Sequence, residues 1–131
     1  MRFALIVYNA PEQGAPAWSA FRFAQAALDA GHEIYRVFFY HDGVLNGAED
    51  RALPQDECDL ARCWQQLGEA HGLDLVVCVS AAKRRGVVDT AEAARQGYAA
   101  NLNPAFELSG LGQYTDALLR ADRVITFGHR S

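Results

Sequence analysis

Residues 73–86 read LDLVVCVSAAKRRG. The apolar half of this segment is typical of a buried β-strand, and the strand pattern ends at Cys78. Small residues follow, and then three consecutive cations, Lys83 to Arg85. Such a segment delivers a thiol to a polar, positively charged edge of a sheet. Cys78 is therefore our candidate for a reactive residue.

Four other segments also have the pattern of strands. Residues 3–8, 33–40, 106–108 and 123–127 are rich in apolar, β-branched and aromatic side chains. Because the first of these segments lacks a small-residue cleavage site, we interpret it as a strand and not as a signal peptide. The turn signal at residues 41–43, His-Asp-Gly, ends the second strand, and the connection from there to residue 55 is expected to be long and irregular.

Helices are predicted between these strands. Three of them have an apolar stripe at helical spacing: Ala17, Ala20, Phe21, Ala24 and Leu28 in the first, Leu60, Trp64 and Leu67 in the second, and Leu111, Tyr114, Leu118 and Ala121 in the last. We expect Asp56 to cap the second helix, which runs to about His71. A short helical turn over 80–85, a capped helix over 89–96 and a tight turn at 109–112 complete the pattern.

The alternation of strands and helices predicts an α/β fold in a single domain over residues 1–131. We expect an open, mainly parallel five-stranded sheet with helices on both faces, of the flavodoxin or Rossmann type. In such sheets the functional crevice lies at the carboxyl ends of the strands. The residues predicted at those ends are Asn9, His41, Asp42, Cys78 and Ser109 to Gly112. They converge only if their strands are neighbours, and the pattern leaves the strand order open.

Composition narrows the functional classes. The net charge of −4 argues against a protein that coats nucleic acid, because neutralising phosphates needs a basic face. The three cysteines show no CxxC or zinc-site spacing, so we expect reduced thiols in a cytoplasmic protein and no metal site. No apolar stretch approaches the length of a membrane span, and no membrane association is expected.

At these same stretches the sequence resembles the TusD/DsrE family of sulfur-relay proteins. The most specific matching segments are 36–44 (RVFFYHDGV), 77–86 (VCVSAAKRRG) and 108–112 (LSGLG). Shorter matches lie at 21–24, 31–33, 59–64, 121–123 and 127–128, whereas 12–18 and 129–131 match less well. The resemblance therefore covers almost the whole chain.

The resemblance implies that Cys78 is the active-site residue, a sulfurtransferase thiol that carries sulfur as a persulfide. It implies an upstream persulfide donor and a small acceptor of the TusE/DsrC type with a cysteine near its C-terminus. It also implies a hexamer with TusC/DsrF-like and TusB/DsrH-like subunits, and no direct contact with tRNA. One branch of the family serves 2-thiolation of the tRNA wobble uridine and the other serves sulfur oxidation; the shared motifs do not separate them.

The chemistry of sulfur transfer explains why a strand-end thiol is suited to this role. The thiolate is the nucleophile, and positive neighbours or the start of a helix favour it. Cys78 would have both if Ser80 begins a helical turn and one of Lys83, Arg84 or Arg85 turns inward. Amides at that turn could also hold a persulfide anion. The alternative interpretation is that Cys78 is a core residue, since free cysteine is commonly buried.

The remaining candidates have simpler interpretations. Cys63 lies beside the apolar stripe and is expected to pack, whereas Cys58 is expected to be exposed on the other side of that helix, with an auxiliary sulfur-carrying role as the alternative. His41 is either a solvated turn residue or part of the thiol's crevice or of a subunit contact. His32 and His71 are expected to interact with the carbonyl ends of the helices before them.

Two features have a surface interpretation and a functional one. The cations at 83–85 form a solvated surface or recruit an acidic partner or tRNA. The SGLG segment at 109–112 lacks the spacing of a dinucleotide loop, so no cofactor is expected. Beside the sulfurtransferase hypothesis stand a non-catalytic scaffold or binding subunit and a flavodoxin-like nucleotide or flavin binder.

Overall fold

The computed structural model describes residues 1–51, 53–54 and 58–129, and it contains one five-stranded sheet. The strands lie in the order β4-β3-β2-β1-β5, and every pair is parallel. Their bounds are β1 Arg2–Val7, β2 Glu33–Phe39, β3 Leu75–Cys78, β4 Phe106–Ser109 and β5 Arg123–Phe127. The predicted α/β class and the five parallel strands are confirmed.

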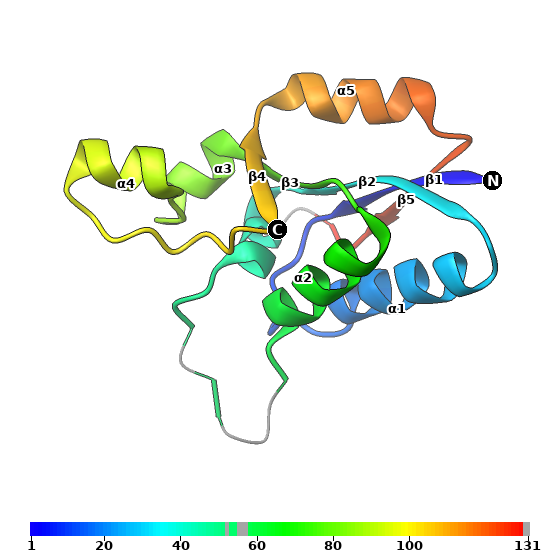
Figure 1. The fold of residues 1–131 in the computed structure, drawn as a ribbon, viewed down its shortest axis with the longest axis horizontal. Coiled ribbons are helices and arrows are strands. Elements are labelled where there is room, and N and C mark those ends of the chain that lie inside the picture. Colours follow the sequence, from blue (N-terminus) through cyan, green and yellow to red (C-terminus); the bar gives the residue numbers. More distant parts are fainter. Residues whose placement is uncertain (52, 55–57, 130–131) are drawn as a thin grey trace.

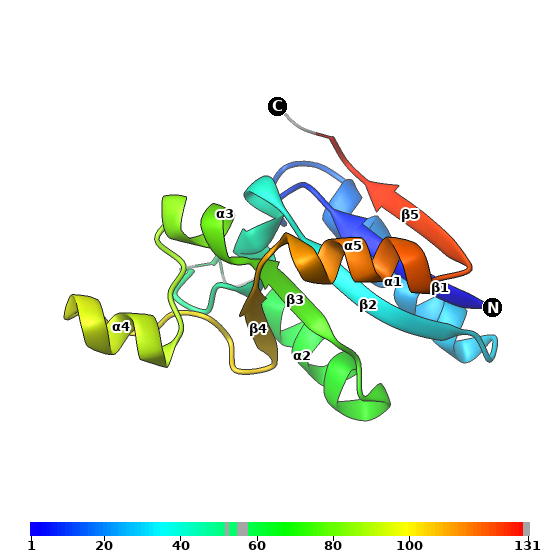
Figure 2. The same cartoon turned by 90° about the horizontal axis from the view of Figure 1, so that it is seen from above.

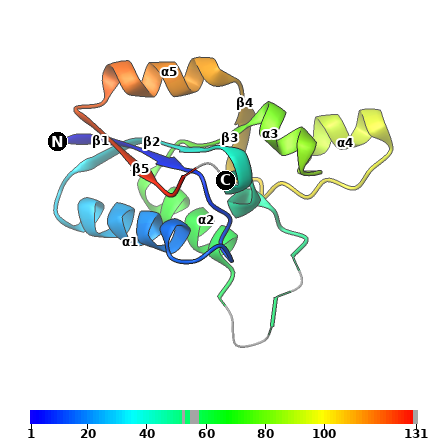
Figure 3. The ribbon, with the colours of Figure 1, turned by 180° about the vertical axis from the view of Figure 1, so that it is seen from behind.

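The helices form two layers around the sheet, as Figure 1 shows from the side and Figure 3 from behind. Helices α1 (Pro16–Asp29) and α2 (Leu60–His71) cover one face, and α5 (Leu111–Arg120) lies on the other. Helices α3 (Val79–Arg84) and α4 (Thr90–Gln96) project beyond the ends of β3 and β4. None of the described helices is both long enough and apolar enough to cross a membrane.

The main core lies between the sheet and the pair α1 and α2. Trp64 is fully buried there, and its ring meets those of Phe21 and Phe39 edge to face at 5.2 and 5.4 Å. The stripe residues Leu60 and Leu67 are buried beside it. On α1 the predicted alanines are buried and the two larger stripe residues are partly buried against the same core: Ala17, Ala20, Ala24, Phe21 and Leu28. Both stripes are confirmed.

The connection after β2 is more regular than predicted. A 3-10 helix, η1, spans His41–Gly47, where the sequence favoured irregular structure. The buried amide of Asn46 stabilises it by donating hydrogen bonds to the carbonyls of Gly43 and Asn9, at 2.8 and 3.0 Å. The contact of Asn46 with Asn9, which is 37 positions away, leaves no periodic signal in the sequence, and the pattern therefore did not predict it.

Helix α2 begins later than predicted. Its first residue is Leu60, and the carboxylate of Asp59 caps it by accepting a hydrogen bond from the backbone N–H of Ala61 at 3.1 Å. Asp56, the predicted cap, lies outside the described residues. Cys58 therefore precedes the helix and does not lie on its far side. The capped start of α4, with Asp89 accepting from the N–H of Glu92, is confirmed.

His32 contacts the carbonyl end of the preceding helix as predicted, but through its backbone. Its backbone N–H, and not its imidazole, bonds the end of α1, at the carbonyl of Ala27. The ring instead places Nδ1 at 3.2 Å from the amino group of Met1 and meets Phe3 edge to face. These contacts, together with the hydrogen bond from the Glu33 N–H to the Met1 carbonyl, hold residues 32–33 against the start of β1.

Helix α5 departs from the predicted apolar stripe. It begins at Leu111, so the expected tight turn at 109–112 is partly helix. Leu111 and Leu118 are exposed, and Ala117 is the buried residue of the helix. Tyr114 of the predicted stripe does pack on Phe38 and Tyr40 of the sheet, and polar contacts also hold α5 in place.

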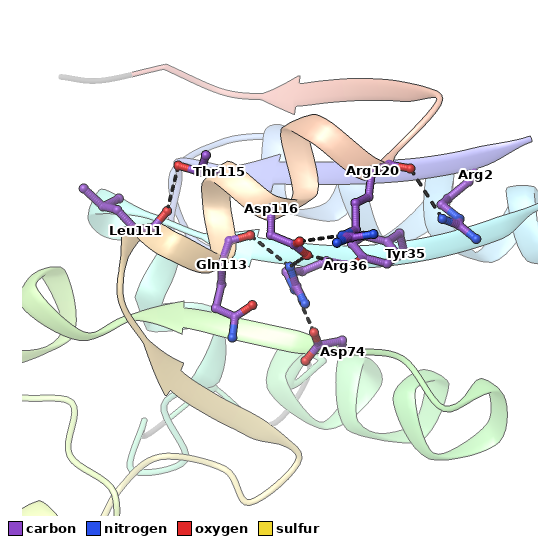
Figure 4. A network of polar contacts seen from close by, with 9 residues as sticks. All are labelled: Arg2, Tyr35, Arg36, Asp74, Leu111, Gln113, Thr115, Asp116 and Arg120. Carbon is purple, nitrogen blue, oxygen red and sulfur yellow. Dashed lines mark hydrogen bonds and ion pairs between the residues drawn. The ribbon is translucent and has the colours of Figure 1, made fainter.

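Those polar contacts centre on Arg36 and Asp116 (Figure 4). The register of β2 with β1 skips Tyr35, since Phe3 pairs with Ile34 and Ala4 with Arg36, and such a bulge re-aims side chains. The Tyr35 hydroxyl and Arg36 Nη1 both donate to Asp116 Oδ2, at 2.6 and 2.9 Å. Arg36 also donates to Asp74 and to the carbonyl of Gln113, so one buried guanidinium links β2, α5 and the start of β3.

Asp116 should make this link sensitive to acid. Hydrogen bonds from Tyr35, Arg120 and Arg36 lower the pKa of Asp116 to about 2, from an unfolded value near 3.9. Its contribution to stability is therefore complete above about pH 4 and lost as the pH falls through about 2. We expect the unfolding free energy of the wild type to drop across this window more steeply than that of Asp116→Asn, measured by urea unfolding from pH 2 to 5. Equal slopes would contradict this role.

Candidate active site at the carboxyl edge of the sheet

The strand order brings the predicted strand-end residues together. Strand β3, which ends in Cys78, lies between β2 and β4, and β1 lies on the far side of β2. Cys78 pairs in register with Ser109, and Phe39 pairs with Val77, so Tyr40 follows at the level of Cys78. Asn9 follows the end of β1, which is the next strand beyond β2 when counted from β3. The convergence that the sequence left open is thus present at the carboxyl edge of β1 to β4.

Cys78 is the last residue of β3 and the N-terminal cap residue of α3. Helix α3 begins at Val79, one residue before the predicted Ser80. The side chain of Cys78 is buried, with 3% of the residue exposed. The thiol is therefore at the predicted place, but in this single chain it is screened from solvent.

Arg85 is the cation that turns inward, and its partner is Asp42. Arg85 Nε lies 2.7 Å from Asp42 Oδ1, and Gln13 donates to Asp42 Oδ2 at 2.9 Å. These hydrogen bonds, from Gln13 first and then from Arg85, lower the pKa of Asp42. The three residues follow β1, β2 and β3, so the pairing ties together the segments that leave these strands. Arg85 is half-buried, and the interpretation of the whole 83–85 run as a solvated surface is wrong for this residue.

Lys83 also has a partner. Its Nζ lies 3.7 Å from a carboxylate oxygen of Glu92 on α4. Glu92 is buried, and it is also paired with Arg95. Two of the three cations beside the strand end, Lys83 and Arg85, are thus paired with acidic side chains.

His41 occupies an unusual backbone conformation. Its φ is +50°, in the left-handed region that non-glycine residues seldom adopt. The half-buried imidazole stacks on Tyr40 at 4.4 Å between ring centroids and lies 5.4 Å from the ring of Tyr8. His41 is therefore part of an aromatic cluster at the ends of β1 and β2 and is not a fully solvated turn residue.

The other two cysteines lie away from this edge. Cys63 is partly buried against the core, and burial raises the pKa of its thiol, which agrees with a packing role. Cys58 is exposed and lines an open groove of about 470 Å³ together with Trp18, Arg22 and Leu60. Cys78 does not line this groove, so the groove beside Cys58 and the strand-end thiol are separate features. The described residues contain no group of three or more metal-ligating side chains.

The sequence pattern does not predict the role of Gln13 or the exact partner of Arg85. Gln13 and Asp42 are 29 positions apart, and Asp42 and Arg85 are 43 apart. No helical or strand period relates residues at such separations. Only the strand order could have revealed these contacts.

A parallel sheet with a cysteine at the end of a central strand defines the class as an α/β protein with a strand-end thiol. The sequence matches the DsrE/DsrF-like family over residues 1–127, and the chain belongs to this family. It is 50% identical over 129 residues to a protein of Allochromatium vinosum named "Putative sulfurtransferase DsrE", an alignment that covers 98% of this chain and 99% of that protein. The fold is similar to the crystal structure of the ychN protein from E. coli, with a TM-score of 0.75 and 22% identity over 97% of this chain and all of the other.

Proposed function

We propose that this chain is a sulfurtransferase subunit that carries sulfur as a persulfide on Cys78. The observation that carries the proposal is the position of Cys78 at the end of a central parallel strand, where functional sites of such sheets lie. Membership of the DsrE/DsrF-like family and the name of the relative from A. vinosum support a role in sulfur transfer.

The chemistry is thiol exchange without net oxidation. The Cys78 thiolate attacks the outer sulfur of a donor persulfide, the donor's S–S bond breaks, and the donor leaves as a thiolate. In the second step the thiolate of an acceptor attacks the outer sulfur now on Cys78. The acceptor becomes the persulfide and Cys78 leaves as the thiolate, so sulfur and electrons balance in each step.

We further propose the surroundings in which the relay works. The donor is an upstream persulfide protein, and the acceptor is of the TusE/DsrC type with a cysteine near its C-terminus. The chain assembles as a hexamer with TusC/DsrF-like and TusB/DsrH-like subunits in the cytoplasm, and it serves tRNA wobble-uridine thiolation or sulfur oxidation. Exposed apolar residues on α5 and β5, among them Leu118, Leu119 and Val124, agree with surface that is buried by neighbours. If the chain sediments as a monomer, and still does so after the TusC/DsrF-like and TusB/DsrH-like subunits are added, the proposal of a hexamer is contradicted.

The alternative is a non-catalytic scaffold subunit, and the 3% exposure of Cys78 is the observation that favours it. The two functions separate in a two-step experiment. The protein is incubated with inorganic polysulfide, freed of it by gel filtration, and mixed with a TusE/DsrC-type acceptor. We expect the protein to gain one sulfur atom and then lose it to the acceptor, as followed by intact-protein mass. A scaffold subunit would pass no sulfur to the acceptor, whatever its exposed Cys58 takes up from polysulfide.

A further inference from the structure

Two of the three cysteines lie at the start of α2, on the side of the sheet opposite α5 (Figure 1 from the side, Figure 2 from above). Cys58 immediately precedes Asp59, the N-terminal cap residue, and Cys63 is the fourth residue of the helix. Side chains at these two positions commonly pack against each other across the first turn of a helix. On one continuous helix, residues five apart would point about 140° away from each other. Because α2 begins only at Leu60, that separation does not apply to Cys58.

Two observations agree with a contact between these thiols. The N–H of Cys63 donates to the carbonyl of Asp59 at 3.1 Å, so the turn that carries Cys63 closes on the residue next to Cys58. Burial raises the pKa of the Cys63 thiol, and the charge of a Cys58 thiolate raises this pKa further. Because the interaction of charges weakens with distance, the second cause indicates that the two sulfur atoms are near neighbours.

The three thiols differ in how easily a small solute can reach them. Cys58 is exposed and lines the open groove of about 470 Å³. Cys63 is half-buried, and Cys78 is 3% exposed. A small oxidant can therefore enter the groove and react with Cys58 first, at a place where a second thiol lies beside it, while Cys78 is screened.

We propose that Cys58 and Cys63 are a redox-active pair, which a small peroxide oxidises to a disulfide while Cys78 stays reduced. The Cys58 thiolate attacks one peroxide oxygen, the O–O bond breaks, and hydroxide leaves, so that Cys58 becomes a sulfenic acid. The Cys63 thiolate then attacks this sulfur, the S–O bond breaks, and a second hydroxide leaves as the S–S bond forms. The two thiols lose two electrons, and the peroxide takes up these electrons and the two thiol protons to become two molecules of water.

The pairing gives the exposed thiol a reversible end state. A sulfenic acid that finds no thiol is oxidised further to sulfinic acid, which thiol reductants do not restore. With Cys63 beside it, the sulfenic acid of Cys58 closes to a disulfide, and exchange with a thiol reductant reopens it. The inference is independent of the proposed relay, because it needs neither a sulfur donor nor Cys78.

The test identifies the state of each cysteine in the unsubstituted protein after treatment with hydrogen peroxide. Free thiols are alkylated, and the denatured chain is cut before its aspartates. Cuts at Asp59 and Asp74 place the three cysteines on three different peptides. Mass spectrometry should find the peptides of Cys58 and Cys63 linked to each other, with neither thiol alkylated. Cys78 should be alkylated, and dithiothreitol should remove the link.

Two variants test whether the position of the second thiol matters. Cys63→Ser removes it, and we expect Cys58 to proceed to sulfinic acid. Arg62→Cys combined with Cys63→Ser restores a thiol at the preceding, exposed position, which points about 100° away around the helix. We expect this double variant to form its disulfide about tenfold or more slowly than the wild type, because the reaction depends on the orientation of the two sulfur atoms.

Three outcomes would overturn the inference. The first is a wild-type protein in which Cys58 becomes sulfinic acid without a link to Cys63. The second is equal rates of disulfide formation in the wild type and in the double variant. The third is a link that joins two chains through Cys58, which a non-reducing gel would show as a dimer. Each outcome leaves the relay through Cys78 intact, because sulfur transfer is measured separately and without peroxide.

Discussion

Replacing Cys78 with serine is expected to abolish sulfur transfer to the acceptor, by about 10³-fold or more. A hydroxyl cannot form the S–S bond on which the relay depends, and serine is otherwise nearly the same size as cysteine. The measurement is single-turnover transfer from a polysulfide-treated protein to a TusE/DsrC-type acceptor. Because Cys78 is buried, an unfolding curve for the variant is needed to show that the loss is chemical and not structural.

Cys58→Ser and Cys63→Ser are the matched controls for this experiment. The exposed Cys58 lies at a separate groove, and the half-buried Cys63 packs on the core. We expect both variants to transfer sulfur at the wild-type rate. If Cys78→Ser keeps its transfer rate, or Cys58→Ser loses it, a residue other than Cys78 carries the sulfur.

Replacing Gly43 with alanine is expected to lower the unfolding free energy by about 3 kcal/mol or more, because overpacking against backbone cannot be relieved by a rotamer change. An added Cβ would lie 2.0 Å from the carbonyl oxygen of Val7. The N–H of Gly43 also donates to the carbonyls of Tyr8 and Tyr40, at 3.1 and 2.8 Å, so η1 cannot move away without losing these bonds. Urea unfolding with a tryptophan or circular-dichroism signal gives the free energy.

The control for Gly43→Ala is Gly112→Ala, which adds the same methyl group in open space. Gly43→Ala should also weaken sulfur loading, because η1 carries His41 and Asp42 at the edge where Cys78 lies. Wild-type stability in Gly43→Ala would show that η1 does not pack on the end of β1 in solution.

The fold was predictable because its determinants are local. Continuous apolar strands, the alanine stripe of α1 and the Leu60, Trp64 and Leu67 stripe of α2 each repeat with the period of their element. The position of Cys78 at a strand end followed from the same pattern. Its burial did not, since that depends on which distant segments pack around the end of β3.

The missed features all depend on contacts between distant segments. Arg36 on β2 bonds Asp74 and Asp116, which are 38 and 80 positions away. These polar contacts hold α5 to the sheet together with Tyr114, while Leu111 and Leu118 of the predicted stripe are exposed. The sequence offered an inward turn of Lys83, Arg84 or Arg85 only as a condition and did not single out Arg85. Its partner Asp42 becomes evident only when β2 and β3 are neighbours.

The most direct test is to locate the sulfur. The protein is incubated with polysulfide labelled with a heavy sulfur isotope, the persulfides are trapped by alkylation, and the digested peptides are analysed by mass spectrometry. The relay predicts one labelled sulfur atom on the peptide that contains Cys78 and none on those with Cys58 or Cys63. Label on Cys58, or an unlabelled Cys78 in the assembled complex, would contradict it.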